Sequence, residues 1–151
     1  MLRKILVPVD FSPASAQALA AARRVCPGGC KRLIHVLSPK RVADANHGSP
    51  INAAQARREL EEGVVKKLKE WAEPDDEIAV VVGSPADAIM AHAEAWGAEI
   101  IVMGTRGRSS LSNFLSGSAT EYLVRHAKLP ILVVHDTPQD EHAAQAVRDS
   151  A

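Results

Sequence analysis

The residues best suited to chemistry lie in a glycine-rich segment that runs from Gly104 to Ser118. Gly104, Gly107 and Gly117 give it the spacing G-x2-G-x9-G-S, between an apolar run and a helical pattern. Glycine leaves backbone N–H groups open to an anion, and the first turn of a following helix adds unpaired N–H groups and a partial positive charge. Arg106 and Ser118 could add charged or hydroxyl donors. The segment therefore predicts a site for phosphate groups.

Two familiar phosphate signatures are absent from the sequence. It contains no G-x-x-x-x-G-K-[ST], and no G-x-G-x-x-G follows the first apolar run. Neither a P-loop NTPase nor a standard dinucleotide-binding fold is therefore supported. Because short glycine motifs are weak signals, a plain surface connection is the alternative interpretation of the segment.

The other reactive residues do not form a recognisable catalytic or metal-binding set. The six histidines are scattered, and we expect them to be structural or solvent-exposed. Cys26 and Cys30 lack a second pair, so reduced structural thiols are expected, with a redox or metal role as the alternative. No G-x-S-x-G presents a serine as a nucleophile. We therefore predict a protein that is not an enzyme, with slow hydrolysis of a bound nucleotide or autophosphorylation left open.

Five short apolar runs rich in β-branched residues indicate strands. They are Ile5–Val9, Leu33–Leu37, Ile78–Val82, Ile100–Met103 and Ile131–Val134. Between them, apolar residues recur at helical spacing, and Ser-Pro pairs at 12–13 and 84–85 are typical helix starts. This alternation predicts a doubly wound, five-stranded parallel sheet of the α/β class, with helices on both faces. In such sheets ligands bind beyond the carboxyl ends of the strands, where the glycine segment falls.

Composition and charge narrow the class of protein. Aromatic residues make up 3% of the chain and hydrophobic residues 46%, so the core must consist mainly of aliphatic side chains, as in parallel sheets covered by helices. Eighteen basic residues balance eighteen acidic ones. The chain therefore lacks the net positive charge that non-specific binding of nucleic acids needs. No apolar run approaches the roughly 20 residues of a membrane-spanning helix, and no signal peptide is recognisable. We expect a cytoplasmic protein that binds neither nucleic acid nor membrane.

Two polar segments fall outside the alternating pattern. Ser38–Pro50 shows no periodicity and is expected to be a mobile loop that could serve as a lid. The tail from Thr137 to Ala151 is expected to be disordered or a short surface helix. The chain is therefore divided into a folded domain at residues 1–136 and a polar tail at 137–151.

With its surroundings, the glycine segment resembles the ATP-binding branch of the universal stress protein family. Val7–Ser12 is similar to the family's opening strand and turn, and His35-Val36 to the end of its second strand. Val82–Pro85 resembles the entry to its third helix, and Pro130–Val134 its closing strand. The resemblance covers nearly the whole folded chain and implies the Rossmann-like fold of the adenine nucleotide alpha-hydrolases.

The resemblance also implies a division of the site. It places Asp10 on the ribose hydroxyls, the Val36 backbone on adenine and Pro8 beside them. For the phosphate groups it implies Met103, Gly104, Arg106, Gly107, Gly117, Ser118, Ala119 and Thr120. The implied ligand is ATP, with Mg²⁺ or Mn²⁺ held mainly by the phosphates and no metal site in the protein itself.

The function implied by the resemblance is that of a stress-response regulatory protein whose output is ligand-dependent binding, toward a protein partner that is unknown. A homodimer through Ile131–Val134 is implied as well, and a second copy would cover an edge strand that otherwise invites uncontrolled pairing. The alternative is a dimeric partner-interaction module of the same fold that binds no nucleotide. A phosphotransfer receiver ranks last, because Gly83-Ser84 stands where its Asp would be needed.

Overall fold

The computed structural model describes residues 1–45, 52–106 and 117–136, and in them strands alternate with helices. The strands are β1 (Lys4–Pro8), β2 (Cys30–Leu37), β3 (Glu77–Val82), β4 (Ile100–Arg106) and β5 (Ile131–Asp136). The helices are α1 (Pro13–Val25), α2 (Pro39–Ala45), α3 (Ala53–Trp71), α4 (Pro85–Trp96) and α5 (Gly117–His126). All strand pairs are parallel, in the order β3-β2-β1-β4-β5, which confirms the predicted doubly wound α/β sheet.

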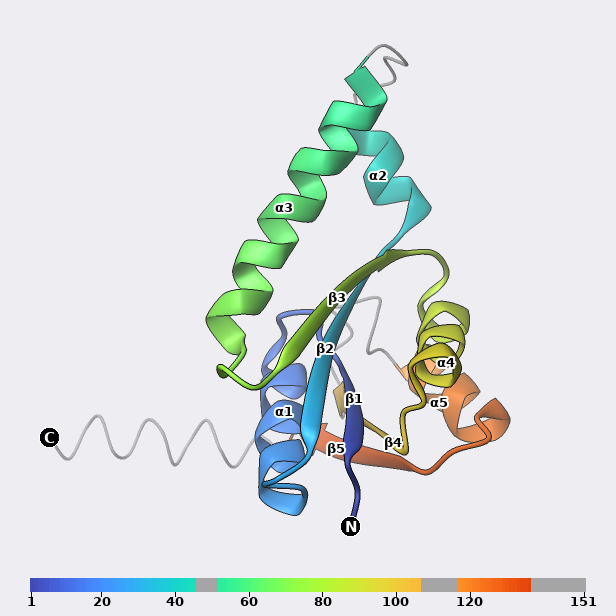
Figure 1. Ribbon diagram of the computed structural model, residues 1–151. Coiled ribbons are helices and arrows are strands. Elements are labelled where there is room, and N and C mark those ends of the chain that lie inside the picture. Colours follow the sequence, from blue (N-terminus) through green and yellow to red (C-terminus); the bar gives the residue numbers. More distant parts are fainter. Residues whose placement is uncertain (46–51, 107–116, 137–151) are drawn as a thin grey trace, which may run out of the picture.

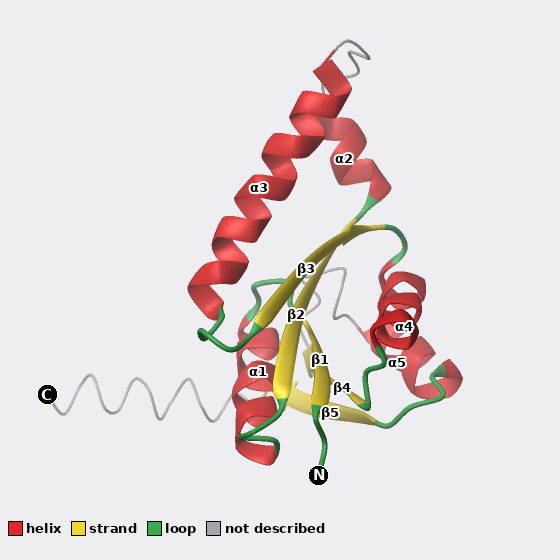
Figure 2. Ribbon diagram, viewed as in Figure 1, coloured by secondary structure: helices red, strands yellow, loops and turns green. Residues whose placement is uncertain are grey.

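Helices cover both faces of the sheet (Figure 1; Figure 2). α1 and α3 pack against one face, and α4 and α5 against the other. The chain first runs outward from β1 through β2 to β3 and then continues on the other side of β1 with β4 and β5. The strand order therefore reverses between β1 and β4, which is the position where doubly wound sheets bind their ligands.

Successive residues of a strand contribute to the two cores in turn. Ile5 and Val7 of β1 pack in the core beneath α1 and α3, whereas Leu6 between them packs beneath α4 and α5. In β4, Val102 belongs to the first core and Ile101 to the second. Because both faces are covered, each strand contains a mainly apolar run, and these runs made the strands recognisable in the sequence.

α3 is amphipathic, as its sequence spacing predicted. Val64 and Leu68 are buried, and Leu60 and Trp71 pack against the same core. Its outer face is charged and carries i,i+4 pairs such as the Arg57–Glu61 ion pair. Although α3 has 19 residues, neither it nor any other described helix is long and apolar enough to cross a membrane.

The prediction of an irregular loop over Ser38–Pro50 is wrong for its first half, which forms α2. Its start signal was present in the sequence: the Ser38 hydroxyl accepts a hydrogen bond from the Arg41 N–H at 3.2 Å, and Pro39 is the first helical residue. An exposed Lys40–Asp44 ion pair spans one turn. The helix is short and polar, so no hydrophobic period marked it. Residues 46–51 and the tail at 137–151 lie outside the described residues.

Gly104 of β4 lies against the start of α1. A Cβ atom built at Gly104 would lie 2.2 Å from the Ala14 carbonyl oxygen and 2.5 Å from the Ala14 carbonyl carbon. These are backbone atoms, so they cannot move aside without shifting the helix. The missing side chain therefore lets the first turn of α1 approach β4 beside the position where the strand order reverses.

We predict that Gly104→Ala lowers the free energy of unfolding by about 1 to 3 kcal/mol, because the added methyl group overpacks this contact. Urea unfolding followed by circular dichroism measures the change. Gly63→Ala is the matched control, since a Cβ atom at Gly63 meets nothing within 4 Å in the interior of α3 and should stabilise the helix by about 0.5 to 1 kcal/mol. Equal unfolding midpoints for Gly104→Ala and the wild type would contradict the contact.

Candidate functional site

The carboxyl ends of β1, β2 and β4 meet at one edge of the sheet, because these strands run parallel. Pro8 ends β1, and Asp10 follows two residues later. Val36 lies near the end of β2 on one side of β1, and Gly104 lies in β4 on the other side. The fold thus brings the predicted nucleoside residues and the start of the predicted phosphate segment to the same edge.

Asp10 is held in a tight turn between β1 and α1. Its Oδ1 atom accepts a hydrogen bond from the Ser12 N–H at 3.0 Å, which restricts the carboxylate. Ser12 in turn is the N-cap of α1, as predicted, and its hydroxyl accepts from the Ser15 N–H at 3.3 Å. The carboxylate of Asp10 is therefore fixed relative to both a strand end and a helix start.

Phe11 occupies the centre of this turn with a left-handed backbone. Its φ angle is 64°, and it is the only non-glycine residue with a positive φ in the described part of the chain. For a residue with a Cβ atom this conformation costs about 1 to 2 kcal/mol. The Phe11 ring packs edge-on against Trp71, with 5.5 Å between centroids, and the Lys67 ammonium lies 5.5 Å from its centroid. Sequence reasoning missed this strained residue, since nothing in its type indicates a positive φ.

His35 is buried next to the same turn. Its Nδ1 atom lies 2.7 Å from the Val9 carbonyl oxygen, and its ring is 5.1 Å from the Phe11 ring between centroids. Because a carbonyl oxygen only accepts, Nδ1 carries the hydrogen. Burial lowers the pKa of His35 below its ordinary value, and the hydrogen bond to Val9 opposes that effect more weakly. His35 is therefore an uncharged donor near pH 7.

Val36 directs its backbone groups toward the side of β1. The Gly83 N–H donates to the Leu37 carbonyl, so Leu37 faces β3, and Val36, one residue earlier, faces the opposite way. β1 ends at Pro8, so the N–H and carbonyl of Val36 are directed at the space beyond that strand end. The Val36 side chain is buried with Met103 in the core beneath α4 and α5.

The start of α5 holds further residues that were predicted to bind phosphate. Gly117 to Thr120 form its first turn, where N–H groups have no partner within the helix and the helix dipole is positive. Thr120 is only 6% exposed, and its Oγ1 atom makes no hydrogen bond to any described residue. A buried hydroxyl usually has a partner, so an unmatched one at a helix start is a candidate contact for an anion.

The remaining predicted residues are placed in part. Ala119 is half-buried in α5, and the backbones of Arg106 and Ser118 belong to β4 and α5. Gly107 lies outside the described residues, as does most of the glycine segment. The assignment of individual ligand contacts therefore stays a prediction, while the meeting of the carboxyl ends of β1, β2 and β4 at one edge of the sheet is observed.

A second polar cluster lies at the opposite end of the strands. Arg32 donates through Nε to Glu77 at 2.8 Å, stacks on the Trp96 ring at 4.3 Å and lies 3.1 Å from the Nε2 atom of His92. Cys30 lies 3.5 Å from a Glu77 carboxylate oxygen, and burial together with this carboxylate raises the pKa of its thiol. A raised pKa disfavours the reactive thiolate, in keeping with the structural role expected of the cysteines.

No three acidic, histidine or cysteine side chains among the described residues are grouped to hold a metal ion.

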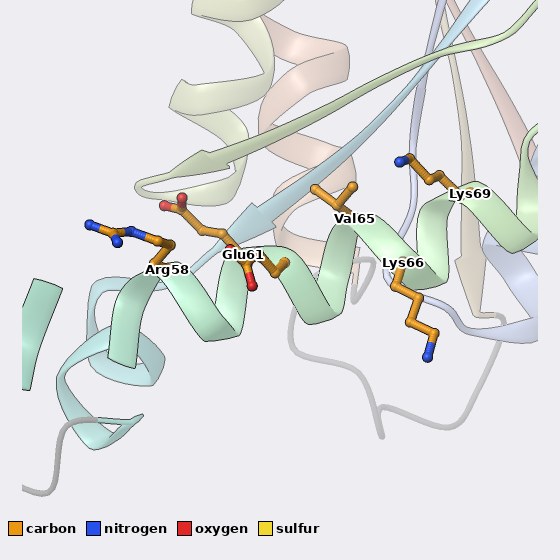
Figure 3. A pocket seen from close by; sticks show the side chains of 6 residues that line it. Arg58, Glu61, Val65, Lys66 and Lys69 are labelled. Atoms are coloured by element: carbon orange, nitrogen blue, oxygen red, sulfur yellow. The ribbon is translucent and has the colours of Figure 1, made fainter. Parts of the chain in front are cut away.

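An open hollow of about 440 Å³ lies beside α3 (Figure 3). It is lined by Arg58, Glu61, Glu62, Val65, Lys66 and Lys69. All six belong to one helix, and their acidic and basic side chains have mixed directions (Figure 3). None is among the residues that the sequence analysis predicted for ligand binding.

The strand order and the position of the site define a doubly wound α/β protein of the Rossmann-like type. Comparison with family models then identifies the family. Residues 1–135 match the model of the universal stress protein family, so this chain belongs to that family. This confirms the family predicted from the sequence.

Individual relatives agree with this assignment. Universal stress protein MJ0577 of Methanocaldococcus jannaschii is 28% identical in sequence, over 89% of this chain and 95% of the relative. Its solved structure superposes with a TM-score of 0.71 at 27% identity, and the match covers 91% of this chain and 98% of the solved chain. A universal stress protein of Thermus aquaticus is 30% identical over 89% of this chain and 99% of its own. A universal stress protein solved in complex with cAMP covers 90% of this chain and 99% of its own at 24% identity, with a TM-score of 0.60, and so shares the fold.

We predict that Thr120→Val does not destabilise the ligand-free protein and raises its free energy of unfolding by about 1 kcal/mol, because it removes a buried hydroxyl without a described partner. Urea unfolding in the absence of nucleotide measures this. Ser15→Ala is the control, because the buried Ser15 hydroxyl donates to the Ser12 carbonyl at 3.0 Å and its loss should cost about 1 kcal/mol. If both variants lost the same stability, the Thr120 hydroxyl would be bonded within the protein.

Proposed function

We propose that this protein is a nucleotide-binding regulatory protein of the stress response that takes ATP at the edge formed by β1, β2 and β4. The observation that carries the proposal is the buried Thr120 hydroxyl in the first turn of α5. It has no described partner, and it lies where unpaired N–H groups and a positive dipole already favour a phosphate group. A nucleotide would place its nucleoside at the turn after β1 and its phosphate groups at the start of α5.

The charge of Asp10 decides which end of the nucleotide it can face. Two like charges about 4 Å apart repel by about 4 kcal/mol at an effective dielectric of about 20. A carboxylate therefore suits the ribose hydroxyls, to which it can accept hydrogen bonds, and not a triphosphate. The position of Asp10 at the end of β1, across from the backbone of Val36, agrees with a nucleoside bound at this strand end.

The Val36 backbone is suited to read the base. An adenine edge offers both a donor and an acceptor, and the N–H and carbonyl of one residue supply the matching pair. Both groups of Val36 are directed at the space beyond β1, next to Asp10. The proposal therefore assigns base recognition to main-chain atoms.

A divalent ion would be held chiefly by the phosphates. Asp10 is assigned to the ribose, and the described residues offer no group of three ligands of their own. Mg²⁺ or Mn²⁺ bound to the triphosphate would reduce its charge in the site. We also infer that the protein acts by binding and not by turnover, with at most slow hydrolysis. The protein solved with cAMP shows that a chain of this fold accommodates an adenine nucleotide.

We predict that ATP with Mg²⁺ raises the thermal unfolding temperature of nucleotide-stripped protein. At about 100 times its dissociation constant the ligand should stabilise the fold by about 2.7 kcal/mol. Gly117→Val should abolish the shift, because the added side chain stands between the anion and the first turn of α5, whereas Gly63→Ala should keep it. Differential scanning fluorimetry with millimolar ATP is the measurement.

The competing proposal is a partner-interaction module of the same fold that binds no nucleotide. Under it, ATP would shift neither the wild type nor Gly117→Val, and the two proteins would behave alike. No shift in the wild type would therefore overturn nucleotide binding and favour the module.

We further propose that two copies associate through β5. No described strand pairs with the outer side of β5. The Ile101 N–H donates to the Pro130 carbonyl, and Ile101 pairs with Ile131, so the backbone groups of Leu132 and Val134 face β4 and those of Val133 face outward. An apolar edge of this kind favours pairing with a second copy.

We predict that light scattering of the wild type gives the mass of two chains at micromolar concentration. Val133→Pro should give the mass of one chain and stay folded, because proline removes only an outward N–H and is tolerated at an edge. Val134→Pro is the contrasting variant, since it removes a hydrogen bond to β4 and should destabilise the fold by about 3 kcal/mol, judged from the cost of proline inside regular structure. A wild-type mass of one chain would rule out the dimer.

A further inference from the structure

The backbone ladder between β1 and β2 stops at Val9. The Val9 N–H donates to the Ile34 carbonyl at 2.8 Å, so the carbonyl of Val9 faces β2 as well. In a parallel ladder the next rung would be a bond from the Val36 N–H to this carbonyl. The described residues contain no such backbone bond.

A side chain takes the place of the missing rung. His35 donates from Nδ1 to the Val9 carbonyl at 2.7 Å. His35 as a residue is 5% exposed, so the bond is shielded from water. The carbonyl that would have accepted from the Val36 N–H accepts instead from the side chain of the preceding residue.

Packing keeps the His35 ring on this acceptor. The Phe11 ring lies against it with 5.1 Å between centroids and is itself held edge-on by Trp71 of α3. The left-handed backbone of Phe11 is what turns its ring toward His35 and Trp71 right after Asp10. The Phe11 ring therefore links the His35 imidazole of β2 to Trp71 of α3.

We propose that His35 is a positioning residue for base recognition: by donating to the Val9 carbonyl it ends the β1–β2 ladder one rung early and keeps the Val36 N–H available to a ligand. The inference rests on the proposed function, since it assigns the means by which the main chain of Val36 reaches the base. Without the imidazole, Val36 would close one more rung with Val9, and its N–H would no longer face the ligand.

Three variants separate this role from simple packing. His35→Leu removes the donor and keeps an apolar side chain of similar reach. His35→Asn keeps a donor, because the amide nitrogen stands at the place of Nδ1. His35→Gln carries its amide nitrogen near the place of Nε2, so it serves as a second donor-less variant at the Val9 carbonyl should His35→Leu fail to fold.

The first measurement is amide hydrogen exchange of Val36, followed by NMR in full-length, ligand-free protein. In His35→Leu, exchange of this amide should slow by about tenfold, as expected for one additional hydrogen bond. In His35→Asn it should match the wild type. Unchanged exchange in His35→Leu, or equal slowing in His35→Asn, would overturn the proposal.

The second measurement compares ATP with inorganic tripolyphosphate by calorimetry. His35→Leu should weaken ATP binding by about tenfold, the value of one hydrogen bond, and leave tripolyphosphate binding unchanged. A merely structural role would weaken both ligands alike, and that result would overturn the proposal. If the wild type bound neither ligand while the exchange difference persisted, the proposed function would fail, and the placement of Val36 by His35 would stand.

Discussion

The pairing of β1 with β4 at the centre of the sheet is the constraint on which the site depends. Ile5 and Leu6 pair with Ile100 and Ile101, although β1 and β4 are separated in sequence by two strands. This pairing reverses the strand order and places the turn after β1 beside the carboxyl end of β4. The close approach of Ala14 to Gly104 holds the start of α1 against β4 at the same place.

The two ends of the sheet differ in how their polar groups are satisfied. At the amino end, Glu99 accepts from the N–H groups of Arg3 and Lys4, and Glu77 pairs with Arg32. At this end, these polar groups are satisfied by partners within the protein. At the carboxyl end, the Asp10 carboxylate accepts from the Ser12 N–H in a turn with a left-handed residue, and the buried Thr120 hydroxyl has no partner among the described residues. Strain and unmatched donors concentrate at functional sites, because folding alone does not favour them.

At this edge, side chains and backbone groups point to different surroundings. Val36 buries its side chain in the core shared with Met103 while its backbone faces the space beyond β1. Phe11 likewise anchors its ring among His35 and Trp71, and its backbone turns the chain from Asp10 into α1. The apolar side chains are thus buried in the core, while the Val36 backbone groups stay directed at the space beyond β1.

The sequence by itself determined the five strands, the amphipathic face of α3, the cap at Ser12 and the family, because each depends on a local period or motif. It missed α2, whose polar residues carry no hydrophobic period, although Ser38 and Pro39 gave a start signal. Only the tertiary structure decided that Phe11 is left-handed, that His35 donates to Val9 and that the Val36 backbone faces the β1 side beyond the end of that strand. These features arise from contacts between β1, β2 and α3. Residue types along one segment do not encode which distant carbonyl a buried ring will reach.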